Sequence, residues 1–254
     1  MRHFGLIGKS LGHSFSAKFF NGKFRAEGID ADYQLFELDN LADIDNLISE
    51  HNLEGFNVTI PYKESIIPHL DGLTKEAHEI GAVNCVVITN GQKIGHNTDI
   101  VGIDASLHWL DIDSNPKALI LGTGGASKAV QHALRRRGIE FMVVSRDASR
   151  GNITYHELSA EIIAEHKLII NTTPVGMSPN VEQAPAIDYS AIGTDHRLFD
   201  LVYNPAKTQF LTLGQEQGAK TMGGMLMLQT QAIASWHLWN EKNNEAEQEP
   251  QHII

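Results

Sequence analysis

Three glycines, Gly122, Gly124 and Gly125, stand where a short apolar run meets a helical pattern. The run before them, 118–121, holds only apolar residues, as expected of a strand that is covered on both faces. The pattern after them, 127–137, predicts a helix. A strand, a glycine turn and a helix in this order can bind a pyrophosphate, because the turn lets the backbone approach the phosphates and the helix N-terminus supplies N–H donors. The alternative is a tight turn that binds nothing.

The next predicted strand, 141–144, leads into a charged segment that bears on which dinucleotide is bound. The end of this strand faces the adenosine ribose, where an arginine accommodates the 2′-phosphate of NADP and an acidic residue selects NAD. Arg146 and Arg150 therefore favour NADP, unless they are ordinary loop charges, and Asp147 keeps NAD open as the alternative. Ser127 takes the third position of the glycine pattern, where glycine or alanine is usual.

Two polar clusters in the first sixty residues suit a small anionic or hydroxylated ligand. Ser14 and Ser16 lie between a predicted strand and a predicted helix, where two hydroxyls and helix N–H groups could hold a carboxylate. Simple capping of the helix is the alternative. Asn57 and Thr59 alternate along the predicted strand 55–60, so both side chains should point to the same side.

Lys63 is placed just beyond the C-terminal end of that strand, the edge at which ligands bind in open α/β sheets. Asn84 and Asp99 follow in the segments 81–84 and 95–99. Spacing alone leaves Lys63 and Asp99 open to interpretation as an ordinary surface ion pair.

Composition excludes several classes of protein. The net charge of −11 argues against a nucleic-acid partner, because phosphate binding needs a basic surface, but it leaves a small anionic substrate possible. The single cysteine, Cys85, allows no internal disulfide and fits a reducing compartment. The histidines show no metal-type spacing, and no segment has the roughly 20 apolar residues of a membrane span. We therefore expect a cytoplasmic protein with no metal and no membrane contact.

The elements that must position these residues form two α/β regions. Strands alternating with helices predict an N-terminal mixed α/β substrate domain, residues 1–101, followed by a Rossmann-like dinucleotide-binding domain with a parallel sheet, residues 102–224. A last helix, 225–240, is expected to rejoin the first domain, and the tail 241–254, rich in Glu, Gln and Asn, is expected to be disordered. The predicted strands are 4–8, 33–38, 55–60, 82–88, 92–95, 118–121, 141–144, 168–170 and 198–202.

The chain resembles the shikimate dehydrogenase family over nearly its whole length, up to about Trp239. Eight stretches carry the resemblance, in the family's order and at its usual separations. They are GLIGKSLGHSFS (5–16), NVTIPYK (57–63), GAVN (81–84), NTD (97–99), GTGGASKA (122–129), NTTPVGM (171–177), DLVYNP (200–205) and GMLMLQTQA (224–232).

The resemblance implies a role for individual residues. Lys63 would transfer the proton, with Asp99 beside it. The residues implied for substrate binding are Ser14, Ser16, Asn57, Thr59, Asn84, Tyr203 and Gln231. The residues implied for cofactor binding are Gly122, Thr123, Gly124, Gly125, Ala126, Ser127, Ser145, Arg146, Arg150, Thr172, Thr173, Leu201 and Gly224.

The implied activity is reversible, NADPH-dependent reduction of 3-dehydroshikimate to shikimate, a step towards chorismate and the aromatic amino acids. Ser145, Arg146 and Asp147 stand where many family members have Asn-Arg-Thr, so a sister enzyme that oxidises quinate or aminoshikimate with NAD is the alternative. A non-catalytic protein that senses shikimate or a nucleotide is a second alternative, against which Lys63 and Asp99 argue. The sequence leaves a monomer and a homodimer equally open.

Overall fold

The structure is a computed structural model, and it describes residues 1–12, 14–112 and 116–241 of the chain. The packing divides the described residues into two units, one formed by residues up to 98 together with 232–241, the other by residues from 99 to 231. The domain limits expected from the sequence, 101 and 224, stay predictions. Residues 242–254 lie outside the described part of the chain, and so does most of the tail for which disorder was predicted.

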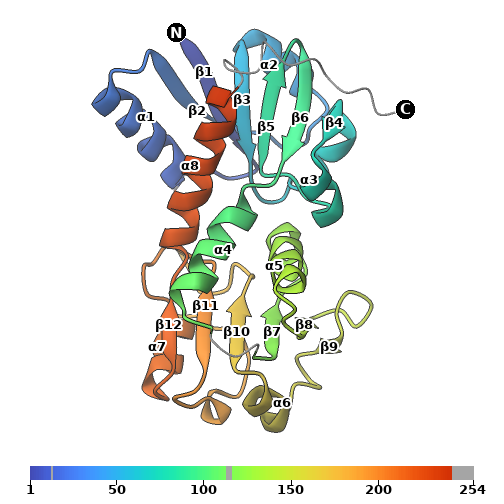
Figure 1. Cartoon of the computed structure of the whole chain (residues 1–254), viewed down its shortest axis with the longest axis vertical. Coiled ribbons are helices and arrows are strands. Elements are labelled where there is room, and N and C mark those ends of the chain that lie inside the picture. The colour runs from blue at the N-terminus through green and yellow to red at the C-terminus, as the bar shows by residue number, and fades with distance from the viewer. Residues whose placement is uncertain (13, 113–115, 242–254) are drawn as a thin grey trace. The chain divides into compact units, whose positions relative to one another are not determined.

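The first unit contains a six-stranded mixed sheet with strand order β2-β1-β3-β5-β6-β4 (Figure 1). Its elements up to residue 98 are β1 (Arg2–Gly8), α1 (Phe15–Glu27), β2 (Ala31–Glu37), α2 (Ile44–Glu50), β3 (Leu53–Val58), η1 (Ile67–His69), β4 (Gly72–Leu73), α3 (Lys75–Ile80), β5 (Cys85–Thr89) and β6 (Gln92–His96). β1 runs parallel to β2 and β3, whereas β5 is antiparallel to both β3 and β6. The mixed α/β character expected of this region is confirmed.

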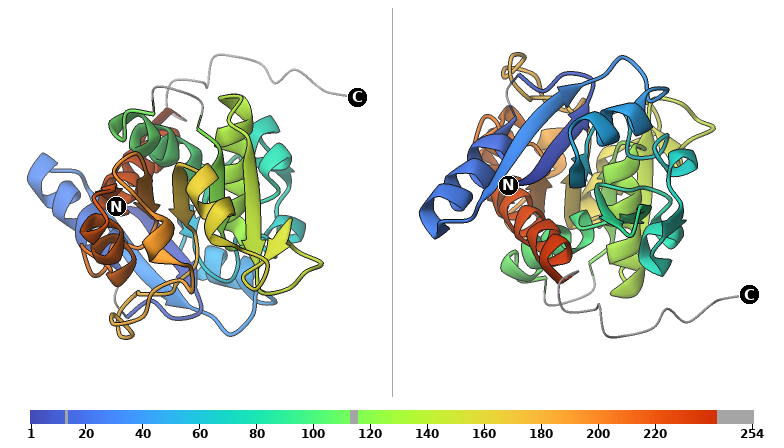
Figure 2. Two further views of the ribbon diagram at one scale, coloured as in Figure 1. Left: turned by 90° about the horizontal axis from the view of Figure 1, so that it is seen from below. Right: turned by 90° about the horizontal axis from the view of Figure 1, so that it is seen from above.

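Each face of this sheet is covered by two helices. Side chains of α1 and of α8 (Met225–Glu241) pack on one face, and side chains of α2 and α3 pack on the other. Figure 2 shows the same elements in two further views of the ribbon. Trp239 of α8 is fully buried, stacks on Phe4 at 4.7 Å between ring centroids, and donates its indole N–H to the Val86 carbonyl at 3.0 Å. Truncating a tryptophan buried in this way costs about 3–5 kcal/mol. The end of the last helix is therefore a structural part of the first unit.

The second unit contains a six-stranded, entirely parallel sheet with strand order β12-β11-β10-β7-β8-β9. Its elements are α4 (Asp99–Trp109), β7 (Ala118–Leu121), α5 (Gly125–Arg136), β8 (Phe141–Ser145), β9 (Ile153–Thr154), α6 (Ala160–Glu165), β10 (Leu168–Asn171), η2 (Tyr189–Ala191), β11 (Arg197–Asp200), α7 (Gln209–Glu216), β12 (Lys220–Met222) and the start of α8. Numbered from β7, the order is 3-2-1-4-5-6, the order of dinucleotide-binding sheets. The Rossmann-like prediction is confirmed, and the strand order reverses between β7 and β10.

Several predicted strands had wrong bounds: the strands expected at 33–38 and 198–202 are Ala31–Glu37 and Arg197–Asp200. Two further differences lie next to predicted site residues. The strand expected at 55–60 ends at Val58, because the Tyr62 N–H donates to the Thr59 carbonyl at 2.8 Å and turns the chain. The strand expected at 82–88 begins at Cys85, and Val83 bonds elsewhere, since its N–H donates to the Lys63 carbonyl at 2.7 Å. Both corrections lie next to predicted site residues, at Thr59 and at Asn84.

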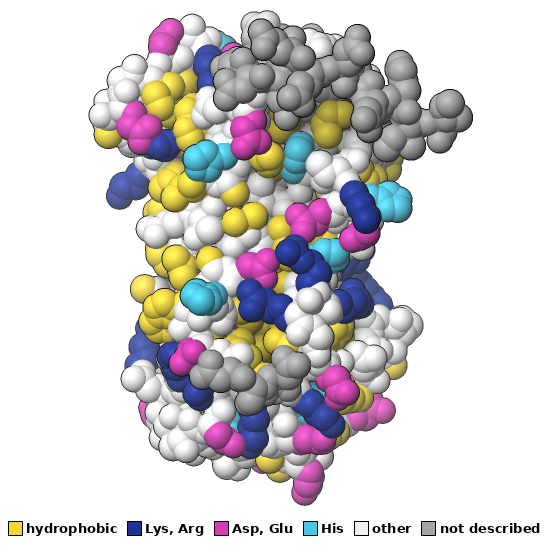
Figure 3. Space-filling view, in the orientation of Figure 1, with side chains coloured by type: hydrophobic (Ala, Val, Ile, Leu, Met, Phe, Trp, Pro, Cys, Tyr) yellow, Lys and Arg dark blue, Asp and Glu magenta, His cyan; other side chains and the backbone are white. Residues whose placement is uncertain are grey.

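In Figure 3, Lys and Arg side chains gather over α5. Arg135, Arg136 and Arg137 lie at the C-terminal end of α5, where basic groups are favoured by the helix dipole. Arg137 donates from Nε to the Asp104 carboxylate of α4 at 3.0 Å, which ties the two helices together. Within residues 1–12, 14–112 and 116–241, none of the helices has the length and hydropathy of a membrane span.

Candidate active site

The predicted glycine turn lies directly after β7, at the point where the strand order of the second unit reverses. Gly122 has φ +113°, and a Cβ on it would lie 2.7 Å from Oγ1 of Thr172, so this position requires glycine. Gly124 is the N-cap of α5, and a Cβ there would meet nothing within 4 Å. A backbone turn with open space at the N-terminus of a helix has the form that admits a pyrophosphate.

Ser127 replaces the third glycine of the pattern and stabilises the turn by another means. Its hydroxyl is buried and donates to the Gly122 carbonyl at 2.7 Å, while Gln131 donates to the Ser127 oxygen at 3.2 Å. The departure from the strict pattern therefore leaves the turn closed by a side-chain hydrogen bond.

The segment after β8 closes a local turn through Asp147. The Asp147 carboxylate accepts from the backbone N–H of Ser149 at 2.9 Å and from its hydroxyl at 2.8 Å, and these bonds lower the pKa of Asp147. The buried Ser145 hydroxyl accepts from the Asp147 N–H at 3.0 Å. Arg150 donates to the Thr123 carbonyl of the glycine turn at 3.4 Å, and Arg146 is exposed. The arginines, rather than the carboxylate, are thus the groups of this segment that suit an added phosphate.

Thr172 and Thr173 follow β10 and border the glycine turn. The Thr172 hydroxyl donates to the Leu121 carbonyl at 2.7 Å, and the Thr173 hydroxyl donates to Oδ1 of Asn171 at 2.6 Å. A Cβ on Gly122 would also lie 2.9 Å from the Thr173 methyl. The structure therefore brings together two of the segments of the second unit that are predicted for cofactor binding.

Leu201 and Gly224 also lie in contact. A Cβ on Gly224 would come within 2.2 Å of the Leu201 carbonyl oxygen, and the Gly224 N–H donates to the Val202 carbonyl at 3.0 Å. Tyr203 lies two residues further along the same loop and is half-buried. The Gln231 amide donates to the Leu228 carbonyl of its own helix at 3.0 Å.

In the first unit, the two predicted carboxylate-binding serines have different local roles. Ser14 is the N-cap of α1, and its hydroxyl oxygen accepts from the Ser16 N–H at 3.3 Å. Binding of a carboxylate by Ser14 stays a prediction. Ser16 is buried, and its hydroxyl lies near the phenol of Tyr33. Burial raises the pKa of Tyr33 well above its usual value, so the phenol remains protonated.

Tyr33 begins a buried chain of polar side chains. Its hydroxyl donates to Oδ1 of Asn57 at 2.8 Å, and Nδ2 of Asn57 donates to the Ser235 hydroxyl at 2.9 Å. Ser235 bonds to the Thr98 hydroxyl at 3.0 Å, and the Asn84 amide meets the same Thr98 hydroxyl at 3.0 Å. Two predicted substrate residues, Asn57 and Asn84, are thus fixed in one network with Tyr33, Thr98 and Ser235.

The two residues predicted to carry the chemistry fall in different units. Lys63 is half-buried after β3, where its carbonyl accepts from Val83, and Thr59 is half-buried just past the same strand. Asp99 is buried and is the first residue of α4, where the helix N-terminus favours a carboxylate. The pairing of Lys63 with Asp99 stays a prediction.

Sequence reasoning missed six buried or partly buried polar residues. Tyr33, Thr98 and Ser235 belong to the network of the first unit. In the second unit, Asn171 and Thr208 both donate to the carboxylate of Asp200. Thr98, Asn171 and Asp200 lie inside the quoted motifs, so a polar residue next to an assigned one was the available signal. Tyr33 and Ser235 carry no local signal, since a tyrosine in a strand and a serine in a helix are ordinary.

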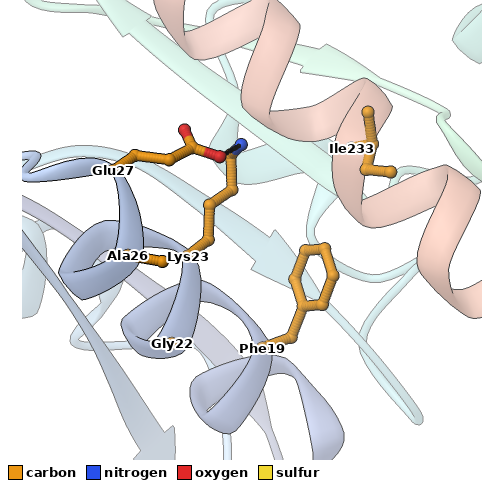
Figure 4. Close-up of a pocket in the computed structure, with 6 residues that line it drawn as sticks. All are labelled: Phe19, Gly22, Lys23, Ala26, Glu27 and Ile233. Atoms are coloured by element: carbon orange, nitrogen blue, oxygen red, sulfur yellow. Dashed lines mark hydrogen bonds and ion pairs between the residues drawn. The ribbon is translucent and has the colours of Figure 1, made fainter.

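A surface hollow of about 380 Å³ lies elsewhere, between α1 and α8 of the first unit (Figure 4). Lys23 and Glu27 form an ion pair of 2.5 Å on its border, and none of the predicted site residues lines it. Its lining residues are Phe19, Gly22, Lys23, Ala26, Glu27 and Ile233.

A parallel sheet of order 3-2-1-4-5-6 with a glycine turn at its switch point defines a dinucleotide-binding α/β protein, here combined with a mixed α/β unit that holds a buried polar network. The model of the shikimate dehydrogenase substrate binding domain matches residues 6–86. The chain is 35% identical to the shikimate dehydrogenase (NADP(+)) of Carboxydothermus hydrogenoformans, over 92% of this chain and 90% of that one. The chain therefore belongs to the shikimate dehydrogenase family.

Two solved structures share the whole architecture. Shikimate 5-dehydrogenase of Thermus thermophilus, in complex with NADP(H) and shikimate, has a TM-score of 0.84 and 30% identity, and the alignment covers 94% of each chain. Quinate dehydrogenase of Corynebacterium glutamicum, in complex with NAD, has a TM-score of 0.85 and 27% identity, over 94% of this chain and 93% of that one.

Proposed function

We propose that this protein is an NADP-dependent shikimate dehydrogenase that interconverts 3-dehydroshikimate and shikimate on the route to chorismate and the aromatic amino acids. The observation that carries the proposal is full-length similarity to NADP-dependent shikimate dehydrogenases, together with a glycine turn whose conformation and open space suit a pyrophosphate. The cytoplasmic location and the choice between monomer and homodimer stay predictions.

The residues proposed to hold NADP are those of the glycine turn, the two threonines after β10, the pair Leu201 and Gly224, and the segment after β8. Its pyrophosphate would lie against the turn 122–127, and its 2′-phosphate would be bound by Arg146 and Arg150. Asp147 is already engaged with Ser149, which supports NADP over NAD. When bound, NADPH supplies the hydride, and the protein supplies placement and a proton.

In the proposed mechanism, Lys63 stabilises the negative charge that builds on the ketone oxygen and donates a proton from Nζ to that oxygen. Asp99 orients the Lys63 ammonium and accepts a hydrogen bond from a neighbouring ring hydroxyl. In the reverse direction, the same Nζ takes the proton from the hydroxyl that is oxidised.

Specificity would come from the buried network of the first unit. Both N–H groups of the Asn57 amide are used inside the protein, by Ser235 and by the Asn84 carbonyl at 3.0 Å, and its oxygen accepts from Tyr33. Asn57 therefore offers a substrate hydroxyl an acceptor, not a donor. A pocket with fixed polar groups rejects analogues that lack the matching hydroxyl, because its own groups would be left unpaired.

The test is a set of four steady-state assays, with shikimate or quinate as substrate and NADP or NAD as cofactor, followed by reduced-nicotinamide absorbance. We expect the highest kcat/KM with shikimate and NADP. A higher value with quinate and NAD would instead support the second candidate, which the quinate dehydrogenase likeness and Asp147 favour. Binding of shikimate without turnover in any assay would support a sensor.

A further inference from the structure

The carboxylate of Asp200 lies at the end of β11, in none of the roles assigned above. It is fully buried, and three donors converge on it. Oδ1 accepts from Nδ2 of Asn171 at 2.9 Å and from the backbone N–H of Val202 at 3.0 Å, and Oδ2 accepts from the Thr208 hydroxyl at 2.5 Å. A buried carboxylate with three donors holds its partners more firmly than a neutral group would.

Those partners belong to the loops that border the predicted cofactor site. Oδ1 of Asn171 accepts from both the N–H and the hydroxyl of Thr173, at 3.0 and 2.6 Å. Asn171 therefore links Asp200 to Thr173 by hydrogen bonds on both sides of its amide. On the other side, Val202 precedes Tyr203, and its carbonyl accepts from the Gly224 N–H at 3.0 Å.

Thr208 anchors the far end of the second loop. It is buried and is the N-cap of α7, where its hydroxyl oxygen also accepts from the Leu211 N–H at 3.4 Å. The loop 201–208 is therefore fixed to Asp200 at both ends, by Val202 at its start and by Thr208 at its end.

We propose that Asp200 is a positioning residue for the proposed reaction: its buried charge holds the loop of Thr173 and the loop of Tyr203 in the arrangement that binds NADP and shikimate. The inference rests on the proposed function, because the two loops matter only if they contact these ligands. Loss of the charge weakens binding of both ligands, and the hydride and proton steps keep their own residues.

The strength with which Asp200 holds its three hydrogen-bond donors depends on the ionisation of its carboxylate. Burial raises its pKa to about 6, although the bonds from Thr208, Val202 and Asn171 lower it. Protonation of the Asp200 carboxylate adds a hydrogen where three donors already point. The Thr208 hydroxyl must then accept a hydrogen bond from Asp200, to which it donates in the ionised state. Tyr189 of η2 is a titratable group near Asp200. Burial and the charge of Asp200 raise the pKa of Tyr189, so the Tyr189 phenol stays neutral. The KM values of the wild-type protein should therefore rise as the pH falls through about 6.

The experiment compares Asp200→Asn with the wild-type protein and with Asp195→Asn, a control at an exposed carboxylate of the same unit. KM for shikimate and for NADP is measured from about pH 5 to 9. At neutral pH we expect Asp200→Asn to raise both KM values about tenfold, the usual size for a bond to a charged group, with kcat changed less. Its shikimate KM should lose the rise near pH 6. Shikimate is the cleaner probe, because the 2′-phosphate of NADP itself titrates near pH 6.

A second pair of variants keeps the test valid if Asp200→Asn does not fold. Thr208→Val removes the hydroxyl that donates to Oδ2 of Asp200, and Thr208→Ser retains it. Thr208→Val should therefore raise the KM for shikimate, and Thr208→Ser should keep the wild-type KM. Wild-type KM values and an unchanged pH profile in Asp200→Asn, or equal KM values in the two Thr208 variants, would overturn the proposal. A wild-type protein without shikimate turnover would instead refute the proposed function itself.

Discussion

The two units prepare their ligand-binding surfaces by opposite means. In the first unit, side chains from distant segments meet inside the protein, as Asn57 and Ser235 do across 178 residues of chain. In the second, a backbone turn is fitted against Thr172 and Thr173 by the absence of a Cβ at Gly122. The comparison teaches that the polar network of the first unit should be sensitive to lost polar atoms, and the glycine turn of the second unit to added carbon atoms.

The largest effect is expected in the first unit, at Lys63. Lys63→Ala should lower kcat by about two to four powers of ten, the usual contribution of general acid–base catalysis, with a modest change in KM. Steady-state shikimate oxidation measures it. Lys75→Ala is the control, because that side chain is 91% exposed in the same unit. Near-normal turnover in Lys63→Ala would remove the residue from the mechanism.

The second unit should show its largest stability effect at Asp200. Because folding raises this pKa from 3.8 to about 6, the folded chain holds the proton more tightly than the unfolded chain. The proton on Asp200 therefore stabilises the folded chain by roughly 3 kcal/mol. This stabilisation is fully present below about pH 4 and is lost as the pH rises through about 6. Relative to wild type, Asp200→Asn should therefore gain stability by about that amount between pH 4 and 7.

Urea unfolding of both proteins across this range measures the difference. Asp195→Asn should show the opposite trend, because Asp195 is exposed and its bond to Lys167 lowers its pKa. A constant stability difference between Asp200→Asn and wild type at every pH would contradict the assignment of the charge to Asp200.

Two glycines sharpen the comparison within the turn itself. Gly122→Ala combines a left-handed φ of +113° with a Cβ contact of 2.7 Å, so it should lower the free energy of unfolding by about 1–3 kcal/mol and raise the KM for NADP. Gly124→Ala adds its Cβ to open space at a φ of −83°, so it should keep wild-type stability and affect only the KM. Thermal unfolding and NADP titration distinguish the two, and equal stability losses would argue against the geometry of the turn.

Removing one phenol oxygen tests the network of the first unit. Tyr33→Phe removes the hydrogen bond that fixes Oδ1 of Asn57 and should raise the KM for shikimate about tenfold. Tyr62→Phe is the matched control, since its hydroxyl bonds to the Leu38 carbonyl and its ring packs in the core on the other sheet face. Should both variants raise KM equally, the effect would be one of general stability.

The smallest effect is expected at Asp147. Because its carboxylate closes a turn with Ser149, Asp147→Ala should leave the preference for NADP over NAD within a few-fold of wild type. Arg146→Ala with Arg150→Ala should instead lose affinity for NADP alone, by roughly tenfold or more for bonds between charged groups. The ratio of kcat/KM for the two cofactors measures both. A large gain in NADP preference in Asp147→Ala would identify the carboxylate as a selector.

Local patterns were sufficient to predict the parallel sheet and its glycine turn. The apolar run 118–121 and the glycines after it are contiguous in sequence, so a short window contains the whole feature. The same reasoning placed the ends of β3 and β5 wrongly, because turns and cross-chain bonds at Thr59 and Val83 decide where pairing stops.

The polar network of the first unit could not be predicted in this way. Thr98 and Ser235 meet across 137 residues, and only the packing of α8 on the sheet brings them together. Family resemblance supplied roles for Asn57 and Asn84 but not the residues that hold them. The convergence of Lys63 and Asp99 depends on chain far apart in sequence and stays a prediction.

The most direct test of that convergence is a crystal structure of the protein with NADP and shikimate bound. The account predicts that Nζ of Lys63 and the carboxylate of Asp99 both lie within hydrogen-bonding distance of the ring hydroxyls at the carbon that is oxidised and its neighbour, with the nicotinamide on the opposite face of that carbon. Shikimate bound away from Lys63, or an Asp99 carboxylate directed elsewhere, would contradict it.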